Sequence, residues 1–153
     1  MYTREQASLV RQQFWTTFGK YMSPILSAEG TKVNWVNYKT GIPQLFFRMD
    51  ADKNQASISI QVMHKDLDLA KRIYAQLENL QPLLHEALGE SWTWEPLLYN
   101  EYGLVLSKIG TQLTPINVFK ESDWPAIISF LKLRIVALDQ FWTAHKMIVE
   151  MSI

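Results

Sequence analysis

The sequence predicts an α+β domain in which a largely antiparallel sheet of about five strands is packed by three main helices. Apolar residues at steps of three and four mark three long helical segments. Apolar and polar residues alternate in short segments between them, which is typical of strands. The links between neighbouring strands are short, which favours antiparallel pairing. The predicted order is helix, three strands, helix, two strands, helix, and 153 residues suit a single domain, residues 1–153.

The first helix is expected over residues 3–26 and the last from Ser122 to about residue 149. Thr3 and Gln6 have the spacing of a capping box, in which each side chain bonds to the backbone of the other residue. Ser122 is the expected N-cap of the last helix.

The second helix is expected to begin at Asp66, a good N-cap residue, and to stop at Gly89. Pro82 falls inside its apolar pattern and cannot donate a backbone hydrogen bond. A kink or break is therefore predicted near residues 79–81.

Five segments carry the strand pattern. Residues 32–38, 44–49 and 57–63 are predicted to form a meander. Residues 92–98 and 103–109 are predicted to form a hairpin that turns at residues 99–102. Ser57 and Ser59 are expected on the exposed face of the third strand. Residues 110–121 are expected as a loop that could add a short strand at 116–119.

Composition excludes several kinds of chemistry. Lys and Arg total 15, as do Asp and Glu, so no global field attracts nucleic acid or an anionic membrane. The absence of cysteine removes disulfides, thiolate nucleophiles and cysteine-based zinc sites. No apolar stretch has the length of a secretory signal or a membrane span. We therefore expect a cytoplasmic protein without a membrane partner and without a cofactor.

Several short motifs carry a resemblance to a known family. They are Phe14-Trp15, the segment 69–77 with 85–89, the tryptophan-rich segment 92–95, and residues 122–124 ahead of a helix containing Phe141. With these motifs the chain resembles a bacterial family of unknown function, usually found as a C-terminal domain of restriction-type or nuclease-associated proteins. The resemblance implies a link to nucleic-acid metabolism or defence, and it supplies no activity for a particular residue.

The predicted order of elements also looks like the restriction-endonuclease core. That core holds Mg²⁺ with acidic residues and places a lysine on its third strand. The corresponding positions here are Ser59, Gln61 and Met63. If the core is present, its active site is degenerate.

Asp50 and Asp52 are the candidate metal ligands, because two carboxylates two residues apart lie near one strand end. A polar turn explains the same residues, since aspartate bonds readily to its own backbone. The sequence favours the turn.

Lys65, Lys71, Arg72 and Arg48 are the candidate nucleic-acid contacts, because phosphates are bound by such cations. Acidic residues in the second helix offset this charge. They are Asp66, Asp68 and Glu78.

The leading hypothesis is a non-catalytic binding or interaction domain, with nucleic acid or another protein as its partner. One alternative is a metal-dependent nuclease with an atypical site that includes Asp50 and Asp52. Another is a small-ligand domain with a cavity between the sheet and the last helix. An exposed sheet edge is also compatible with a homodimer.

Overall fold

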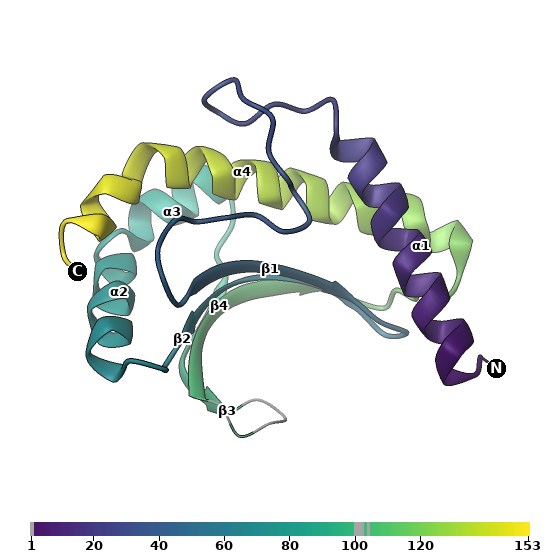
Figure 1. Ribbon diagram of the computed structural model, residues 1–153, viewed down its shortest axis with the longest axis horizontal. Helices are drawn as coiled ribbons and strands as arrows, with labels where there is room; N and C mark the ends of the chain where they lie inside the picture. The colour runs from purple at the N-terminus through teal and green to yellow at the C-terminus, as the bar shows by residue number, and fades with distance from the viewer. Residues whose placement is uncertain (1, 100–102, 104) are drawn as a thin grey trace.

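The computed structural model describes residues 2–99, 103 and 105–153, and its elements confirm the α+β class (Figure 1). The helices are α1 (Arg4–Met22), α2 (Leu67–Asn79), α3 (Gln81–Leu88) and α4 (Trp124–Glu150), with a 3-10 turn, Glu121–Asp123, before α4. The strands are β1 (Leu45–Ala51), β2 (Ala56–Met63), β3 (Thr93–Tyr99) and β4 (Val105–Leu113). Within the described residues, none of these helices combines the length and the apolar character that a membrane crossing requires.

The strands form one antiparallel sheet in the order β1-β2-β4-β3. The register places Phe47 opposite Ile60 and Ile60 opposite Ile109, so one layer of apolar side chains crosses three strands. The antiparallel arrangement is confirmed. The sheet has four strands in the described part of the chain, whereas about five were expected.

The first predicted strand, residues 32–38, is wrong. These residues form an irregular segment whose bonds run to other parts of the fold: the indole Nε1 of Trp35 donates to the Ile25 carbonyl oxygen at 3.0 Å. The apolar residues of this segment pack on the core, and their alternation reflects that burial. Two strands, not three, therefore lie between α1 and α2, so the element order behind the restriction-endonuclease-like prediction is not reproduced.

The ends of the first two predicted helices follow local chemistry. The capping box of Thr3 and Gln6 is confirmed, although α1 ends at Met22 and not at residue 26. The second predicted helix divides at Leu80 into α2 and α3, with Pro82 in the first turn of α3. The predicted break is confirmed, and the described part of the chain has four main helices where three were expected. Gly89, with a φ of 69°, ends α3 as predicted.

The predicted start of the last helix needs correction. Ser122 lies in the 3-10 turn, and Asp123 takes the N-cap position without a capping bond. The Asp123 carboxylate instead accepts the Asn117 backbone N–H at 3.0 Å, which fixes the preceding loop.

The second hairpin is longer than predicted, because β4 continues to Leu113. Residues 116–119 form no strand, although the Ile116 and Val118 amides donate to the carbonyl oxygens of Asn54 and Asp52. Most of the predicted turn at 99–102 lies outside the described residues.

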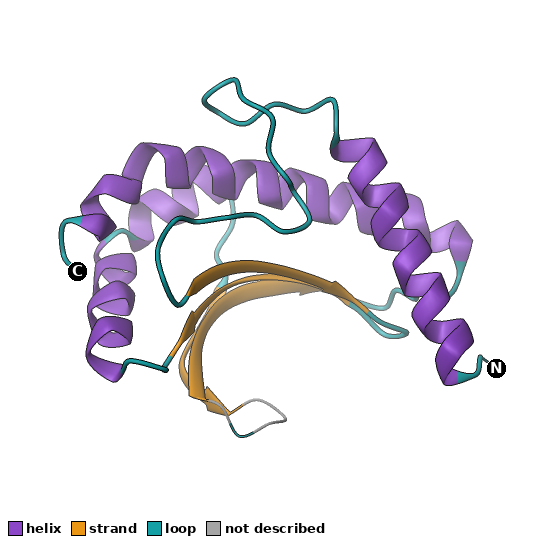
Figure 2. Cartoon of the chain, in the orientation of Figure 1, coloured by secondary structure: helices purple, strands orange, loops and turns teal. Residues whose placement is uncertain are grey.

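The core lies between the sheet and the helices. α4 crosses the convex side of the curved sheet, with α3 beside it (Figure 2). Fully buried side chains such as Phe14, Ile60 and Leu138 join α1, β2 and α4 in one hydrophobic cluster. Each such side chain stabilises the fold by roughly 1.5–3 kcal/mol. One face of the sheet is thereby used for folding, and the other is left for contact with solvent or a partner.

Candidate functional site

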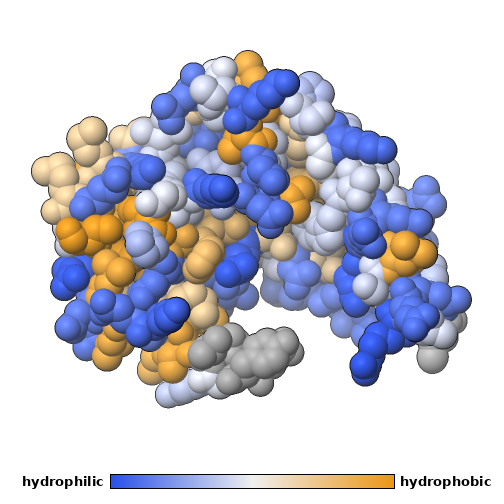
Figure 3. Space-filling view, in the orientation of Figure 1, coloured by the Kyte–Doolittle hydropathy of each residue, from blue (hydrophilic) through white to orange (hydrophobic). Residues whose placement is uncertain are grey.

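The open face of the sheet carries the residues that alternate with the core positions. On β1 these are Phe46, Arg48 and Asp50, and the register places them opposite Gln61, Ser59 and Ser57 of β2. The adjoining residues of β4 are Lys108, Gly110 and Gln112. This face lies on the concave side of the sheet, where the space-filling view shows a notch in the outline of the molecule (Figure 3).

The floor of this face is closely packed, which corrects one expectation. Ser59 is buried at 3% exposure, and Ser57 is half-buried, whereas both were expected to be exposed. Gly110 of β4 lies opposite Ser59, and a side chain there would begin 2.9 Å from the Ser59 Cβ atom. The absence of a side chain at this position leaves room for Ser59, whose hydroxyl accepts a hydrogen bond from the Gln61 side-chain amide at 3.0 Å.

Phe46 is the exposed aromatic residue of the open face on β1. The residue is 37% exposed, and the Arg48 guanidinium carbon lies 4.4 Å from the ring centre. A cation over an aromatic face is held by electrostatic attraction. The pair therefore presents an apolar surface and a positive charge side by side.

A cavity of about 620 Å³ adjoins Phe46, and we call it the Phe46 cavity. It is lined by Pro43, Gln44, Phe46, Met63, His64, Lys65 and Val105. Its volume lies within the range of about 300–1,000 Å³ that is typical of small-molecule sites.

Gln44 fixes one wall of the Phe46 cavity. It adopts a φ of 69°, which is uncommon for a residue with a side chain. Its amide donates to the carbonyl oxygens of Met63 (2.8 Å) and Asp66 (3.1 Å) and accepts the Asp66 N–H at 2.6 Å. Asp66 in turn caps α2 as predicted, by accepting the Leu69 N–H. These bonds hold the link between β2 and α2 beside the start of β1.

His64 belongs to a hydrogen-bonded chain behind the cavity. Ser107 donates its hydroxyl to the Pro96 carbonyl oxygen at 2.6 Å, so the Ser107 oxygen accepts from Nε2 of His64 at 2.8 Å. The second ring nitrogen, Nδ1, is buried and finds no partner among the described residues. Burial, and then the charge of Lys71, lower the pKa of His64 below its ordinary 6.5. The ring is therefore neutral near neutral pH.

Of the four predicted cations, Lys65 alone lines the Phe46 cavity, and Arg48 and Lys71 each act on another residue of its lining. Arg48 lies on Phe46, Lys65 lines the Phe46 cavity, and Lys71 is close enough to His64 to act on its pKa. Arg72 is exposed on α2 beside Lys71 in sequence but does not line the cavity. Sequence analysis missed Phe46, which the pattern showed only as the polar-side residue of an alternating strand.

Asp50 and Asp52 bond to the backbone of their own hairpin. Asp50 accepts the Ala51 N–H at 2.8 Å, and Asp52 accepts those of Asn54 and Gln55 at 2.7 and 2.9 Å. Over residues 2–99, 103 and 105–153, no three histidine, aspartate or glutamate side chains cluster as a metal site would require.

Fold and site together define an α+β domain with an open sheet face, an exposed aromatic–cation pair and an adjoining cavity. The sequence places this domain in a family. Residues 10–146 match the family model described as "Domain of unknown function (DUF4268)", and the chain belongs to that family. Comparison with curated proteins gave no match, and comparison with solved structures gave none.

Proposed function

We propose that this protein is a binding domain that holds single-stranded nucleic acid across the open face of its sheet, at the Phe46 cavity. The observation that carries the proposal is the exposed Phe46 ring with Arg48 upon it, beside a cavity edged by Lys65. An aromatic ring stacks on a base of any kind, and cations beside it bind the phosphates that flank the base.

The charges of this region favour an anionic ligand. Arg48, Lys65 and Lys71 come from β1, the link after β2, and α2. Lys65 lines the Phe46 cavity, Arg48 lies on the ring of Phe46, and the charge of Lys71 acts on His64, which also lines the cavity. The chain as a whole has a net charge of zero, so attraction acts at short range and not through a global field. We therefore expect moderate affinity that falls as salt is added.

A single strand suits this surface better than a duplex. Stacking on Phe46 needs a base that is not already stacked within a helix. A base that reached the Phe46 cavity would meet Met63 and Val105 as apolar contacts. The small-ligand and nuclease alternatives stay predictions, and in the nuclease case Asp50 and Asp52 already serve the hairpin backbone.

Fluorescence anisotropy with a labelled oligothymidine tests the proposal. Each phosphate contact should lower log K by about 0.7 per unit of log salt concentration. Lys65→Glu and Lys71→Glu should each weaken binding about tenfold, and Phe46→Ala should weaken it by a similar factor through lost stacking. Lys53→Glu is the matched control, because Lys53 is exposed on the hairpin at the opposite end of β1.

Equal affinity for the wild type and for the Lys65→Glu and Phe46→Ala variants would contradict the proposal. Equal affinity of the Lys53→Glu and Lys65→Glu variants for the oligothymidine would also contradict it. Circular dichroism of each variant should show the wild-type spectrum, because the four substituted side chains are exposed. They are Phe46, Lys53, Lys65 and Lys71.

A further inference from the structure

β1 forms one edge of the sheet, and two backbone bonds fix which of its residues face β2. The Met63 N–H donates to the Gln44 carbonyl oxygen at 2.9 Å, and the Asp52 N–H donates to that of Gln55 at 2.8 Å. Paired residues alternate along an antiparallel ladder. The even-numbered residues between these two bonds therefore point their backbone groups toward β2, and the odd-numbered residues point theirs away from it.

Among the described residues, the odd-numbered positions at the centre of β1 find no hydrogen-bond partner for their outward backbone groups. At the start of the strand, the Leu45 N–H donates to Ile42, and the Leu45 carbonyl oxygen accepts the Thr40 hydroxyl at 2.8 Å. Phe47 and Met49 follow, and the described residues provide no hydrogen bond to their free-edge N–H and C=O groups. An unpaired strand edge of this kind is a template for another strand.

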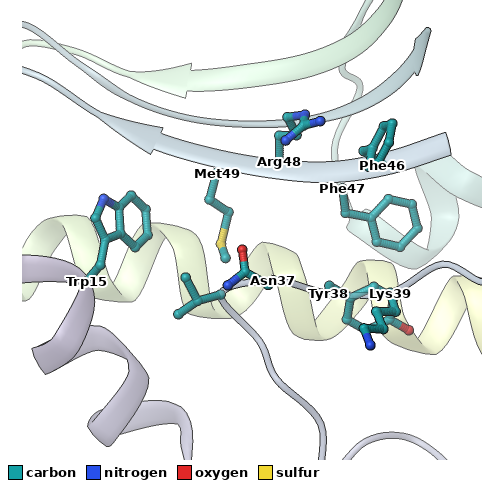
Figure 4. Close-up of a pocket in the computed structure, with 9 residues that line it drawn as sticks. Trp15, Asn37, Tyr38, Lys39, Phe46, Phe47, Arg48 and Met49 are labelled. Carbon is teal, nitrogen blue, oxygen red and sulfur yellow. The ribbon is translucent and has the colours of Figure 1, made fainter. Parts of the chain in front are cut away.

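A groove of about 460 Å³ runs along this same edge (Figure 4). Phe46 and Arg48 line it from the open face of the sheet, and Phe47 and Met49 line it from the core face. A space that touches both faces of one strand lies beside the strand, in line with the sheet. The groove is therefore where the next strand of the sheet would lie.

The far wall of the groove is a ledge, which consists of Trp15 of α1 and residues 36–39. The ledge is fixed to the helices: the Tyr38 hydroxyl donates to the buried Asp139 of α4 at 2.5 Å. Asp139 also accepts the Ala28 N–H at 2.8 Å, so both of its oxygens hold the segment between α1 and β1. Trp15 and Val36 are only half-buried and present apolar surface to the groove.

The ledge and the charges identify the kind of occupant. A second copy of this chain would bring its own ledge into the space beyond β1, because pairing through a two-fold axis places both ledges on the same side of the sheet. A single extended segment has no such obstacle. The described residues that line the groove include two cations, Lys39 and Arg48, and no carboxylate.

We propose that the β1 edge binds an extended segment of a partner protein in which acidic and apolar residues alternate. The segment adds to the sheet beside β1 by strand addition. Its apolar residues lie opposite Phe47 and Met49, exchange backbone hydrogen bonds with them and contact the ledge. Its acidic residues lie opposite Arg48 on the open face, and one of them reaches Lys39 at the end of the groove. The inference does not rest on the nucleic-acid proposal.

Defined heptapeptides of alternating glutamate and valine test this inference by calorimetry and by amide chemical shifts. The glutamate–valine peptide should bind and shift the Phe47 and Met49 amides. A lysine–valine peptide should bind at least about tenfold more weakly, because like charges oppose one another across a strand pair. A glutamate–valine peptide with N-methylated valines should lose a similar factor, since those nitrogens are the donors to β1.

Two matched variants separate the groove from general charge. Lys39→Glu should weaken binding of the glutamate–valine peptide about fivefold, whereas Lys32→Glu should leave it unchanged. Both lysines are exposed in the same segment, and only Lys39 lines the groove. Neither variant enters the nucleic-acid test, so failure of one proposal is distinguishable from failure of the other.

Three results would overturn the inference. Equal binding of the glutamate–valine and lysine–valine peptides would remove the charge selection, and undiminished binding of the N-methylated peptide would remove strand addition. A dimer of the free protein, detected by sedimentation and shifting the Phe47 and Met49 amides with concentration, would make a second copy the occupant in place of a partner.

Discussion

The two edges of the sheet are built differently. β3 loses its register with β4 between Glu95 and Leu98, and Pro96, which lacks a backbone donor, falls in that irregular stretch. Irregularity and proline both make an edge poorly suited to further pairing. β1 keeps unbroken register with β2 from Leu45 to Ala51 and presents a fixed ledge beside its free side.

This difference supports β1 as the edge at which a partner segment adds to the sheet. An edge that needed only protection from aggregation would carry a bulge or a proline, as β3 does. β1 has neither over its paired length, and its Phe47 and Met49 backbone groups remain available. The groove that follows β1 gives those groups a place to be used.

The largest expected effect is a loss of stability when a buried side chain of β1 is removed, compared with removal of an exposed side chain of β3. Phe47 is 5% exposed and packs against Trp142 at 5.8 Å between ring centres, whereas Leu97 of β3 is 59% exposed. Phe47→Ala should lower the free energy of unfolding by about 3–5 kcal/mol. Leu97→Ala should change it by less than about 0.5 kcal/mol. Urea denaturation measures both, and similar losses in the two variants would contradict the comparison.

The next effect concerns the anchor of the ledge. Asp139→Ala should cost about 2–3 kcal/mol in urea denaturation, because it leaves the Ala28 N–H and the Tyr38 hydroxyl without their acceptor. Burial, and then the bond to Asp139, raise the pKa of Tyr38, so its hydroxyl remains a donor throughout the ordinary pH range. Tyr38→Phe should cost less, about 1 kcal/mol. Wild-type stability of Asp139→Ala would show that the ledge is not anchored in this way.

A smaller effect on stability is expected at Ser107 of β4. Ser107 is buried and joins His64 to the Pro96 carbonyl oxygen. Ser107→Ala should lower the free energy of unfolding by about 1–2 kcal/mol, because two polar groups lose their partner. Ser57→Ala, on the neighbouring strand, should cost less than about 0.5 kcal/mol. Thermal denaturation compares the two variants. An equal shift of the melting temperature in both would argue against the hydrogen-bonded chain of His64, Ser107 and Pro96.

The smallest effect is a pH dependence. The folded state lowers the pKa of His64, so the unfolded chain binds more protons as pH falls through the ordinary value of 6.5. Stability should therefore decrease below about that pH, and the His64→Gln variant should lose less stability over the same interval. The comparison uses urea denaturation of both proteins at neutral and mildly acidic pH. Parallel losses would show that His64 does not contribute.

Much of the fold could be predicted from the sequence, because burial of one face of a helix or strand makes apolar residues recur at a fixed spacing. Ile58, Ile60 and Val62 alternate and form the central strand, and the break at Pro82 follows from its missing donor. Residues 32–38 show the limit of such reasoning. Trp35 and Tyr38 alternate with polar residues as strand residues do, yet their side chains bond to Ile25 and Asp139. The spacing of apolar residues indicates which side chains are buried, but it does not indicate where the backbone finds its hydrogen-bond partners.

The candidate site was less predictable because it depends on contacts distant in sequence. The cations Lys65, Lys71 and Arg48 could be proposed as a group from their type alone. Phe46 could not, since its exposure depends on which face of β1 the helices cover. The groove beside β1 is formed by Trp15, residues 36–39 and β1 together, and only the folded chain places these segments next to one another.

Amide hydrogen exchange along β1 tests the central claim most directly. In the free protein, the Phe47 and Met49 amides should exchange faster than those of Phe46 and Arg48, which are bonded to β2. Addition of the glutamate–valine heptapeptide should slow the exchange of Phe47 and Met49 selectively. Slow exchange of Phe47 and Met49 in the free protein, unchanged by the peptide, would mean that this edge is already occupied and would contradict the account.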